Sequence, residues 1–383
     1  MAAVERRRAQ HGRPIRVGLA GLVAACAACN ALLGNESGEV AAVTEAGASS
    51  SSGSSGTGGS SGAADGGVTS SSSSGSSSGG GSSSGGPPVE ALGPGRAVAV
   101  TDRSLVIVTL EGTVRHTALD GTSDDSDFTF ASQGGQLVPA VAAVASRPTP
   151  DGVLGRIMVM AQDERLFDCG PSQCTPYPYV PQPRSLTAAA GGILLSSEAE
   201  GTPSNLVLLT APMAVPVVVR DAVASTLLAA NASRYFYAYD RQSVSFGSYG
   251  GGVPGSELVL VPGTGALSAL AASETDAYLA GRCEVGSICA FTLGDSTGAH
   301  PFRSIYAPAV SAAPSNVREL FIDDTTLYWS AQYETRATTS RCDLTAGCTE
   351  TATEIMPVMV TSFSRNSQHV YFAANGAIYR VAR

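Results

Sequence analysis

The chain has 383 residues, of which only 14% are charged, and its formal net charge is −9 at neutral pH. A typical soluble domain is about 25% charged. Binding to a nucleic-acid backbone requires clustered positive charge, and the only run of basic residues here is Arg6–Arg8. The composition therefore argues against a nucleic acid as a partner.

Residues 1–25 predict a secretory signal. Several arginines precede an uncharged stretch, residues 17–35, and this order is typical of a signal peptide. The apolar part ends in Leu22–Cys26, which resembles the bacterial lipobox, so we expect Cys26 to carry a lipid. An ordinary cleaved signal and an uncleaved membrane anchor are the alternatives, and each exports the chain. Because Ala27 stands where an inner-membrane retention signal has Asp, the resemblance implies an outer membrane lipoprotein that faces the periplasm or the outside.

A flexible connection is expected between the lipid and the folded part. Residues 26–48 form a tether, and residues 49–88 form a linker rich in Ser and Gly. From Ser49 to Gly86, 32 of 38 residues are Ser or Gly. Such a segment buries too little apolar surface to offset its ordering entropy, so we expect disorder there. The folded domain is expected at residues 89–383.

Seven short apolar strands recur through this domain, each after a polar turn. They are Leu105–Val108, Arg156–Met160, Ile193–Leu195, Tyr235–Tyr239, Ala277–Ala280, Leu327–Ser330 and Val370–Ala373. Another apolar strand precedes most of the turns and a third strand usually follows, while no window shows sustained helical periodicity. Short strands at this repeat length are typical of β-propeller blades. We therefore predict an all-β fold, a β-propeller of seven blades, although six or eight blades also fit the spacing.

The last repeat ends after its third strand. We expect the missing outer strand to come from residues 89–96, at the other end of the domain, or to be absent. Alanine-rich runs such as Ala140–Ala145 are expected on the innermost strands, where side chains crowd the axis of the ring.

The repeat around Trp329 resembles one that is known. Tyr328–Ser330, followed by Arg341-Cys342 and Gly347-Cys348, is similar to the YWTD-type propeller repeats in exported proteins of myxobacteria and related bacteria. The resemblance implies a β-propeller in an exported lipoprotein. It implies no particular activity, since one fold serves many functions.

Six further cysteines form three local pairs. These are Cys169 and Cys174, Cys283 and Cys289, and Cys342 and Cys348. Their even number, their short spacing and the expected export of the chain predict disulfides. Zinc binding is the alternative, but zinc sites use Cys-x2-Cys knuckles that converge with other ligands, and no histidine lies near these pairs.

No catalytic motif stands out. His11, His116, His300 and His369 fall in separate parts of the chain, and none belongs to a triad motif. The best metal candidate is an acidic cluster, which consists of Asp120, Asp124, Asp125 and Asp127. It lacks the register of a calcium loop, and a solvated loop is the simpler interpretation. Asp323 and Asp324 form a second candidate, facing a central channel, and their simpler interpretation is a turn.

Three tyrosines form the candidate binding surface. Tyr235, Tyr237 and Tyr239 alternate along one strand and would share one face. Such a face suits a sugar or a peptide, but aromatic side chains on strands are commonly core, so packing between blades is the favoured interpretation.

These features predict a monomeric, envelope-anchored β-propeller that acts as a binding or scaffold module for a protein or glycan, with no cofactor and no catalytic residues. Its only contact with the membrane is an N-terminal lipid. The alternative is a calcium-dependent hydrolase or lactonase with an axial site, which would require carboxylates and amides to converge at the axis. A purely structural component of the envelope is a third interpretation.

Overall fold

The structure, a computed structural model, describes residues 88–383 with internal gaps. The gaps are residues 120–125, 132–134, 146–155, 171–172, 179, 181, 190–191, 199–203, 211–214, 222, 224, 226, 250–256, 285, 294–299 and 310–312. The expected signal, Cys26 and the linker up to residue 87 lie outside the described residues. Asp120, Asp124 and Asp125 lie outside them as well.

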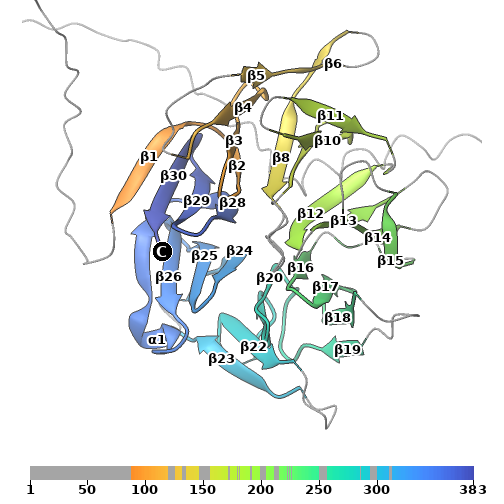
Figure 1. Cartoon of the computed structure of the whole chain (residues 1–383). Coiled ribbons are helices and arrows are strands. Elements are labelled where there is room, and N and C mark those ends of the chain that lie inside the picture. The colour runs from red at the N-terminus through yellow and green to blue at the C-terminus, as the bar shows by residue number, and fades with distance from the viewer. Residues whose placement is uncertain are drawn as a thin grey trace, which may run out of the picture. The chain divides into compact units, whose positions relative to one another are not determined.

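Seven four-stranded antiparallel sheets form a ring, which confirms the predicted seven-bladed β-propeller (Figure 1). The innermost strands are β2 (Ala97–Val100), β8 (Ala140–Ala145), β12 (Pro183–Ala189), β16 (Leu228–Ala230), β20 (Ala269–Ala272), β24 (Asn316–Asp323) and β28 (Val360–Arg365). The second strands are β3 (Leu105–Val108), β9 (Ile157–Ala161), β13 (Gly192–Ser197), β17 (Arg234–Ala238), β21 (Asp276–Ala280), β25 (Thr326–Gln332) and β29 (His369–Ala374).

Two further strands complete each blade toward the rim. The third strands are β4 (Val114–Thr117), β10 (Leu166–Cys169), β14 (Asn205–Leu209), β18 (Ser243–Ser248), β22 (Ile288–Thr292), β26 (Ala337–Asp343) and β30 (Ala377–Ala382). The outer strands are β5 (Ser126–Phe128), β11 (Cys174–Tyr177), β15 (Val217–Arg220), β19 (Glu257–Leu260), β23 (Phe302–Tyr306), β27 (Thr353–Met356) and β1 (Val89–Pro94). We number the blades 1 to 7 in the order of their innermost strands.

Two small elements lie outside the blades. A hairpin of β6 (Phe130–Ala131) and β7 (Leu137–Val138) connects blades 1 and 2, and a single turn of helix, α1 (Cys348–Thr351), precedes β27. In the part of the chain that the structure describes, no helix has the length and apolar character needed to cross a membrane.

The second strands are apolar because neighbouring blades cover both of their faces. In β3, the four residues Leu105–Val108 are all buried, and β21 is buried along its whole length. Successive side chains of a strand point to opposite faces. A strand that is covered on both faces therefore favours apolar residues on both, and this preference produces the repeated apolar runs of the sequence.

The ring closes where the two ends of the domain meet. Strand β1 pairs antiparallel with β30 and so becomes the outer strand of blade 7, as the sequence predicts; Figure 1 shows orange β1 beside blue β30. The register sets Val89 opposite Val381, and it shifts between Ala91 and Gly93. At the rim, Arg380 forms an ion pair with Glu90 at 2.8 Å. The closure covers the edge of β30, which would otherwise present unpaired backbone groups.

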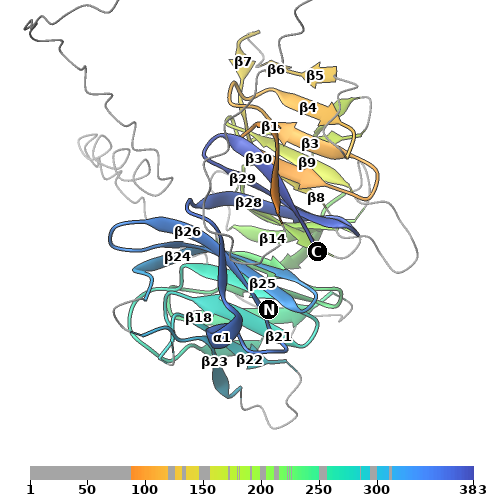
Figure 2. The same cartoon turned by 90° about the vertical axis from the view of Figure 1, so that its left-hand side faces the viewer.

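Aromatic side chains fill the spaces between blades. Trp329 is fully buried between blades 5 and 6, and its ring lies 4.9 Å from that of Tyr306. Tyr328 and Phe372 are buried between blades 6 and 7. Figure 2 shows the sheets from a direction at right angles to that of Figure 1. Large rings thus fill much of these two interfaces, and alanines line much of the channel at the axis.

Candidate functional site

The innermost strands surround an axial channel of about 620 Å³. Small and apolar residues make up most of its wall, among them Ala142, Ala188, Ala229 and Ala271, each from a different blade. The alanine-rich runs therefore lie where the sequence predicts. A cavity of this size falls within the range of roughly 300–1,000 Å³ that is usual for ligand pockets. We take this channel and its surroundings as the candidate site.

Four charged side chains form a network at one end of the channel, which we call the mouth cluster: Asp323, Asp324, Arg365 and Arg383. Asp323 ends β24 and is buried, and it accepts hydrogen bonds from both guanidinium groups; its Oδ2 lies 2.7 Å from Nε of Arg383. Asp324 also pairs with both arginines, at 3.0 Å from Arg365. Sixty residues separate Asp323 from Arg383 in the chain, and the packing of blade 6 against blade 7 brings them together.

The backbone explains the position of Asp324. Its φ of 51° lies in the left-handed region, which Asp tolerates better than most residues and which the tight turn between β24 and β25 requires. Burial by itself would raise the pKa of Asp324, but the hydrogen bond and charge of Arg365, together with Arg383, hold this pKa below its ordinary value. Both carboxylates of the mouth cluster are therefore engaged by arginines. The turn interpretation of Asp323 and Asp324 agrees with this geometry.

A polar cleft of about 400 Å³ adjoins the channel between blades 5 and 6. Asp276, at the start of β21, accepts hydrogen bonds there from Arg303 at 2.7 Å and from Thr275 and Thr292. Burial would raise the pKa of Asp276, but these hydrogen bonds, led by that of Arg303, lower it. Asp324 and Arg365 line both cavities, so the cleft and the channel mouth form one continuous surface.

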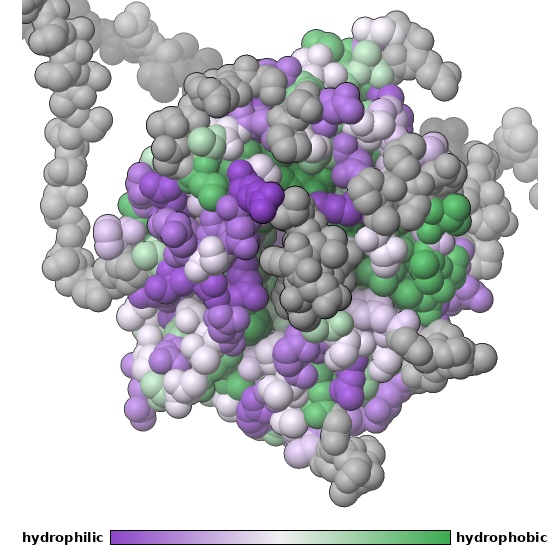
Figure 3. Space-filling view, in the orientation of Figure 1, coloured by the Kyte–Doolittle hydropathy of each residue, from purple (hydrophilic) through white to green (hydrophobic). Residues whose placement is uncertain are grey.

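Blades 6 and 7, which carry the mouth cluster, present the most hydrophilic part of the described surface in this view (Figure 3). Figure 3 shows hydrophilic side chains gathered over blades 6 and 7, whereas apolar side chains gather over the outer part of blade 3. The apolar side chains of the outer strands include Val217 and Val218, which are 51% and 50% exposed. The charged face and the apolar rim are therefore distinct surfaces.

One carboxylate lies inside the channel without a partner. Glu319, on β24, is half-buried and lines the channel, and no hydrogen bond or ion pair joins it to any described residue. Burial raises its pKa to about 7. Nothing in the sequence around Glu319 marks it out; it follows a register shift at Arg318 in an otherwise ordinary strand.

This raised pKa predicts a pH dependence of stability. Because the folded pKa of Glu319 exceeds its ordinary value of 4.5, the native state binds the proton more tightly than the unfolded state does. The contribution of protonated Glu319 to the free energy of unfolding is therefore fully present below about pH 4.5 and is lost as the pH rises through about 7. We expect Glu319→Gln to be the more stable protein above pH 7, by on the order of 1–2 kcal/mol, and to match the wild type below about pH 4.5.

Thermal denaturation of both proteins from pH 4 to pH 9 tests this prediction. A Tm difference that does not change with pH would show that Glu319 is not the titrating group. Glu354→Gln is the control. This exposed residue lies on the outer strand β27 and pairs with Arg336 at 3.0 Å, but an ion pair at the surface adds little stability, so its Tm should stay close to that of the wild type at every pH.

The histidines do not converge on the channel. His116 is buried on β4, His300 lies beside Glu257 on blade 4, and His369 begins β29. Asp127, the described member of the acidic cluster, pairs with Arg115 at 3.0 Å. Among the described residues, no group of three or more His, Cys, Asp or Glu side chains is placed to hold a metal ion. The described part of the channel thus lacks the converging carboxylates that an axial calcium site requires.

The three tyrosines do not form one exposed surface, and for two of them the structure agrees with the favoured interpretation of packing between blades. Tyr235 and Tyr237 are fully buried between blades 3 and 4, and the hydroxyl of Tyr235 donates to the carbonyl of Val219 at 3.2 Å. Only Tyr239, which follows the end of β17, is exposed, at 58%. The space between two blades needs large side chains, so packing explains the first two residues.

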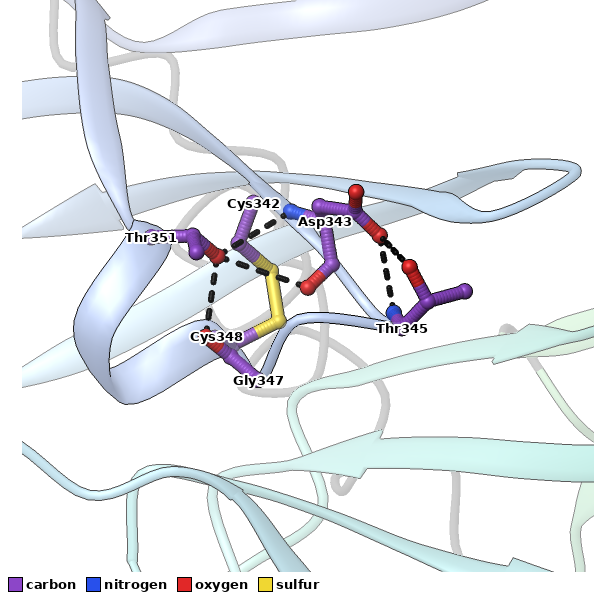
Figure 4. Close-up of a disulfide and its surroundings, with 6 residues drawn as sticks. All are labelled: Cys342, Asp343, Thr345, Gly347, Cys348 and Thr351. Atoms are coloured by element: carbon purple, nitrogen blue, oxygen red, sulfur yellow. Dashed lines mark hydrogen bonds between the residues drawn. A yellow bond between two sulfur atoms is a disulfide. The ribbon is translucent and has the colours of Figure 1, made fainter.

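The three predicted disulfides are present. They join Cys169 to Cys174, Cys283 to Cys289 and Cys342 to Cys348. Figure 4 shows the last of these holding the loop between β26 and β27. In that loop Asp343 accepts hydrogen bonds from the backbone and hydroxyl of Thr345, and the hydroxyl of Thr351 donates to Gly347 at 2.9 Å (Figure 4). The bridges lie in separate blades and stabilise local loops.

We expect the paired change Cys342→Ala and Cys348→Ala to lower the free energy of unfolding by on the order of 2 kcal/mol, because closing a loop this short restricts the unfolded chain by that amount. Denaturant unfolding of the oxidised proteins measures the loss. The control is Glu350→Gln, an exposed change in the same loop, for which we expect no measurable effect. Equal stability of the paired variant and the control would contradict the prediction.

Comparison with known proteins supports the fold and nothing narrower. No family model and no curated sequence matches the chain. YCF48 from Cyanidioschyzon merolae superposes with a TM-score of 0.53 at 10% identity, over 77% of this chain and 97% of that one. YCF48 bound to a D1 peptide gives 0.52 at 9%, over 77% and 97%. A catalytically inactive virginiamycin B lyase from Staphylococcus aureus, with quinupristin, gives 0.52 at 10%, over 77% and 99%.

At identities this low, the likeness defines the class of protein, a β-propeller, and not its activity. The class contains proteins that bind and proteins that catalyse, as the lyase and the peptide complex show. The function of this chain therefore depends on the residues of its own channel and mouth cluster.

Proposed function

We propose that the chain is an exported, envelope-anchored β-propeller that binds a protein or a glycan without catalysing a reaction. The observation that carries the proposal is the continuous surface formed by the channel, the mouth cluster and the adjoining cleft. It offers charged groups and hydroxyls on a rigid ring, and loops on a rigid scaffold are the usual place for binding residues. The complex of YCF48 with a D1 peptide supports a peptide segment as the ligand, since that protein has a similar fold.

The absence of a metal cluster and of a nucleophile motif among the described residues favours binding over hydrolysis. The mouth carboxylates are already paired with arginines, so they are suited to hold the shape of the surface rather than to take up a proton. An exchange of these ion pairs for contacts with a charged partner would give specificity more than affinity.

The binding surface is tested best by changes that remove charge and keep the size of each side chain. In the mouth variant, Asp324→Asn is combined with Glu274→Gln. Glu274 lines the adjoining cleft and accepts a hydrogen bond from the backbone N–H of Ala232 at 2.9 Å, which the oxygen of Gln can also accept. Asn tolerates the left-handed backbone at residue 324. In the rim variant, Glu350→Gln is combined with Glu354→Gln, which removes the same formal charge at α1 and β27. Each protein is immobilised and exposed to envelope extract, and retained proteins and glycans are identified.

We expect the wild type and the rim variant to retain the same ligand and the mouth variant to lose most of it. A ligand retained equally by all three proteins would place the binding surface elsewhere. A metal-dependent turnover of lactones or esters by the wild type would replace the binding proposal with the hydrolase.

The anchoring part of the proposal rests on the sequence: the signal at residues 1–25, Cys26 in its lipobox-like setting, and the resemblance of Tyr328–Ser330 to repeats of exported lipoproteins. Expression in a bacterium with a lipoprotein pathway tests it. We expect the wild type in the outer membrane fraction with a lipid-modified N-terminal cysteine, and Cys26→Ala without the lipid. An unmodified N-terminus in the wild type would contradict the anchor.

A further inference from the structure

Glu319 lies beside an aromatic pair on the same side of its strand. No register shift separates Glu319 from Phe321 in the pairing of β24 with β25, so the two side chains point to the same face. That face is turned toward blade 7, since Phe321 stacks on Phe363 of β28 with ring centroids 5.4 Å apart and planes at 14°. Glu319, Phe321 and Phe363 all line the channel and are only half-buried.

The other charges of the channel do not neutralise Glu319. The charged residues that line it besides Glu319 are Arg96, Asp102, Arg318, Asp324, Arg365 and Arg383. Arg96 donates to the carbonyl of Ala140, and the last two arginines pair with the mouth carboxylates. Arg318 is adjacent in sequence but exposed, and it forms no ion pair with Glu319. The elements packed around Glu319 add Tyr328 of β25 as a titratable group, with Ser330, Thr361 and Ser362 as neutral ones.

We propose that the axial channel binds an organic ammonium group, with the Glu319 carboxylate as its counterion and the stacked rings of Phe321 and Phe363 as its apolar contact. A cation beside a carboxylate and near an aromatic face gains from both. A calcium ion takes six to eight oxygen ligands. Among the carboxylates that line the described channel, Asp324 pairs with arginines, Asp102 accepts a hydrogen bond from the backbone of Ser367, and Glu319 alone has no partner. An aliphatic amine needs one counterion and an apolar wall, which the channel supplies.

The inference rests on the proposed binding role and names the group that the channel takes. The ammonium group could belong to a free amine or to a lysine side chain of a partner, and the two share this chemistry. The chain itself contains no lysine, so it cannot occupy the site with its own ammonium side chain. Binding should weaken as the pH falls and Glu319 takes up a proton.

The test uses the purified full chain with its disulfides formed, and isothermal titration with three probes at pH 8 and pH 5. The probes are n-butylammonium chloride, N-acetyl-lysinamide and, as the neutral control, n-butanol. We expect at least one amine to bind at pH 8 and n-butanol not to bind. We expect the affinity for the amine to fall at least tenfold in Glu319→Gln and at least tenfold in the wild type at pH 5.

Binding of n-butylammonium alone would identify a free amine, and binding of N-acetyl-lysinamide would identify a lysine side chain. Either result supports the proposal. Glu354→Gln on the outer strand should bind as the wild type does. Phe363→Leu, which keeps an apolar side chain but removes the aromatic face, should bind more weakly. The proposal is overturned if neither amine binds, if n-butanol binds as well as the amines, or if Glu319→Gln binds as tightly as the wild type. The mouth variant keeps Glu319, so the capture experiment tests the proposed function independently of whether the channel binds an ammonium group.

Discussion

A chain that begins at Ala97, and so lacks β1, is expected to lose roughly 5 kcal/mol of stability, or roughly 10 °C of Tm. The deletion removes the outer strand of blade 7 and leaves β30 with an open edge. Several backbone hydrogen bonds, each worth about 1 kcal/mol net, disappear with it. The ion pair between Arg380 and Glu90 and the partial burial of Val89 and Leu92 disappear too. The exposed edge should also promote aggregation.

Two comparisons make this result specific. A chain that begins at residue 87 keeps β1 and should melt with the full-length protein. A synthetic peptide of residues 88–96, added in excess to the shortened protein, should restore part of the lost Tm, because it can pair with β30. If the chain from Ala97 melts at the temperature of the full-length protein, the ring does not depend on this closure.

Trp329→Ala is expected to cost about 3–5 kcal/mol, the usual loss for a large aromatic residue deleted from a core. The side chain is fully buried between blades 5 and 6, against Tyr306 on one side and the apolar strands of both blades on the other. The interface is rigid on both sides, so the space left by the indole cannot close. Denaturant unfolding with tryptophan-independent detection, such as circular dichroism, measures the change.

Trp329→Phe is the matched control. The indole NH of Trp329 has no hydrogen-bond partner among the described residues, so the replacement gives up volume and no hydrogen bond. We expect a loss of about 1–2 kcal/mol, well below that of the alanine variant. Equal losses in the two variants would show that the interface depends on the indole NH or is disrupted by any change.

The sequence predicts the fold because each blade repeats one local pattern. The run Leu105–Val108 is apolar at every position, since neighbouring blades cover both faces of β3, and the same demand recurs in the other second strands. The closing strand could also be predicted, because the last repeat lacks one strand and the domain begins with a spare one. The disulfides follow from cysteines so close in the chain that a hairpin brings them together.

The candidate site was much less predictable. Asp323 and Arg383 belong to one network only because the ring places the ends of β24 and the C-terminal strand side by side, and no local pattern encodes that meeting. Glu319 sits in a strand like any other, and its lack of a partner depends on where Arg318 and the channel arginines of blades 1 and 7 point. Tyr237 could not be assigned for a different reason. Its alternating aromatic pattern is visible in the sequence, but the same pattern occurs on exposed binding surfaces and between packed blades.

Native mass spectrometry with metal analysis of the purified chain tests the central claim, a metal-free binding propeller, most directly. We expect a monomer with three intramolecular disulfides and no stoichiometric metal, whose Tm does not change on chelation. One tightly bound calcium per chain, lost together with stability when a chelator is added, would contradict it and would favour the hydrolase.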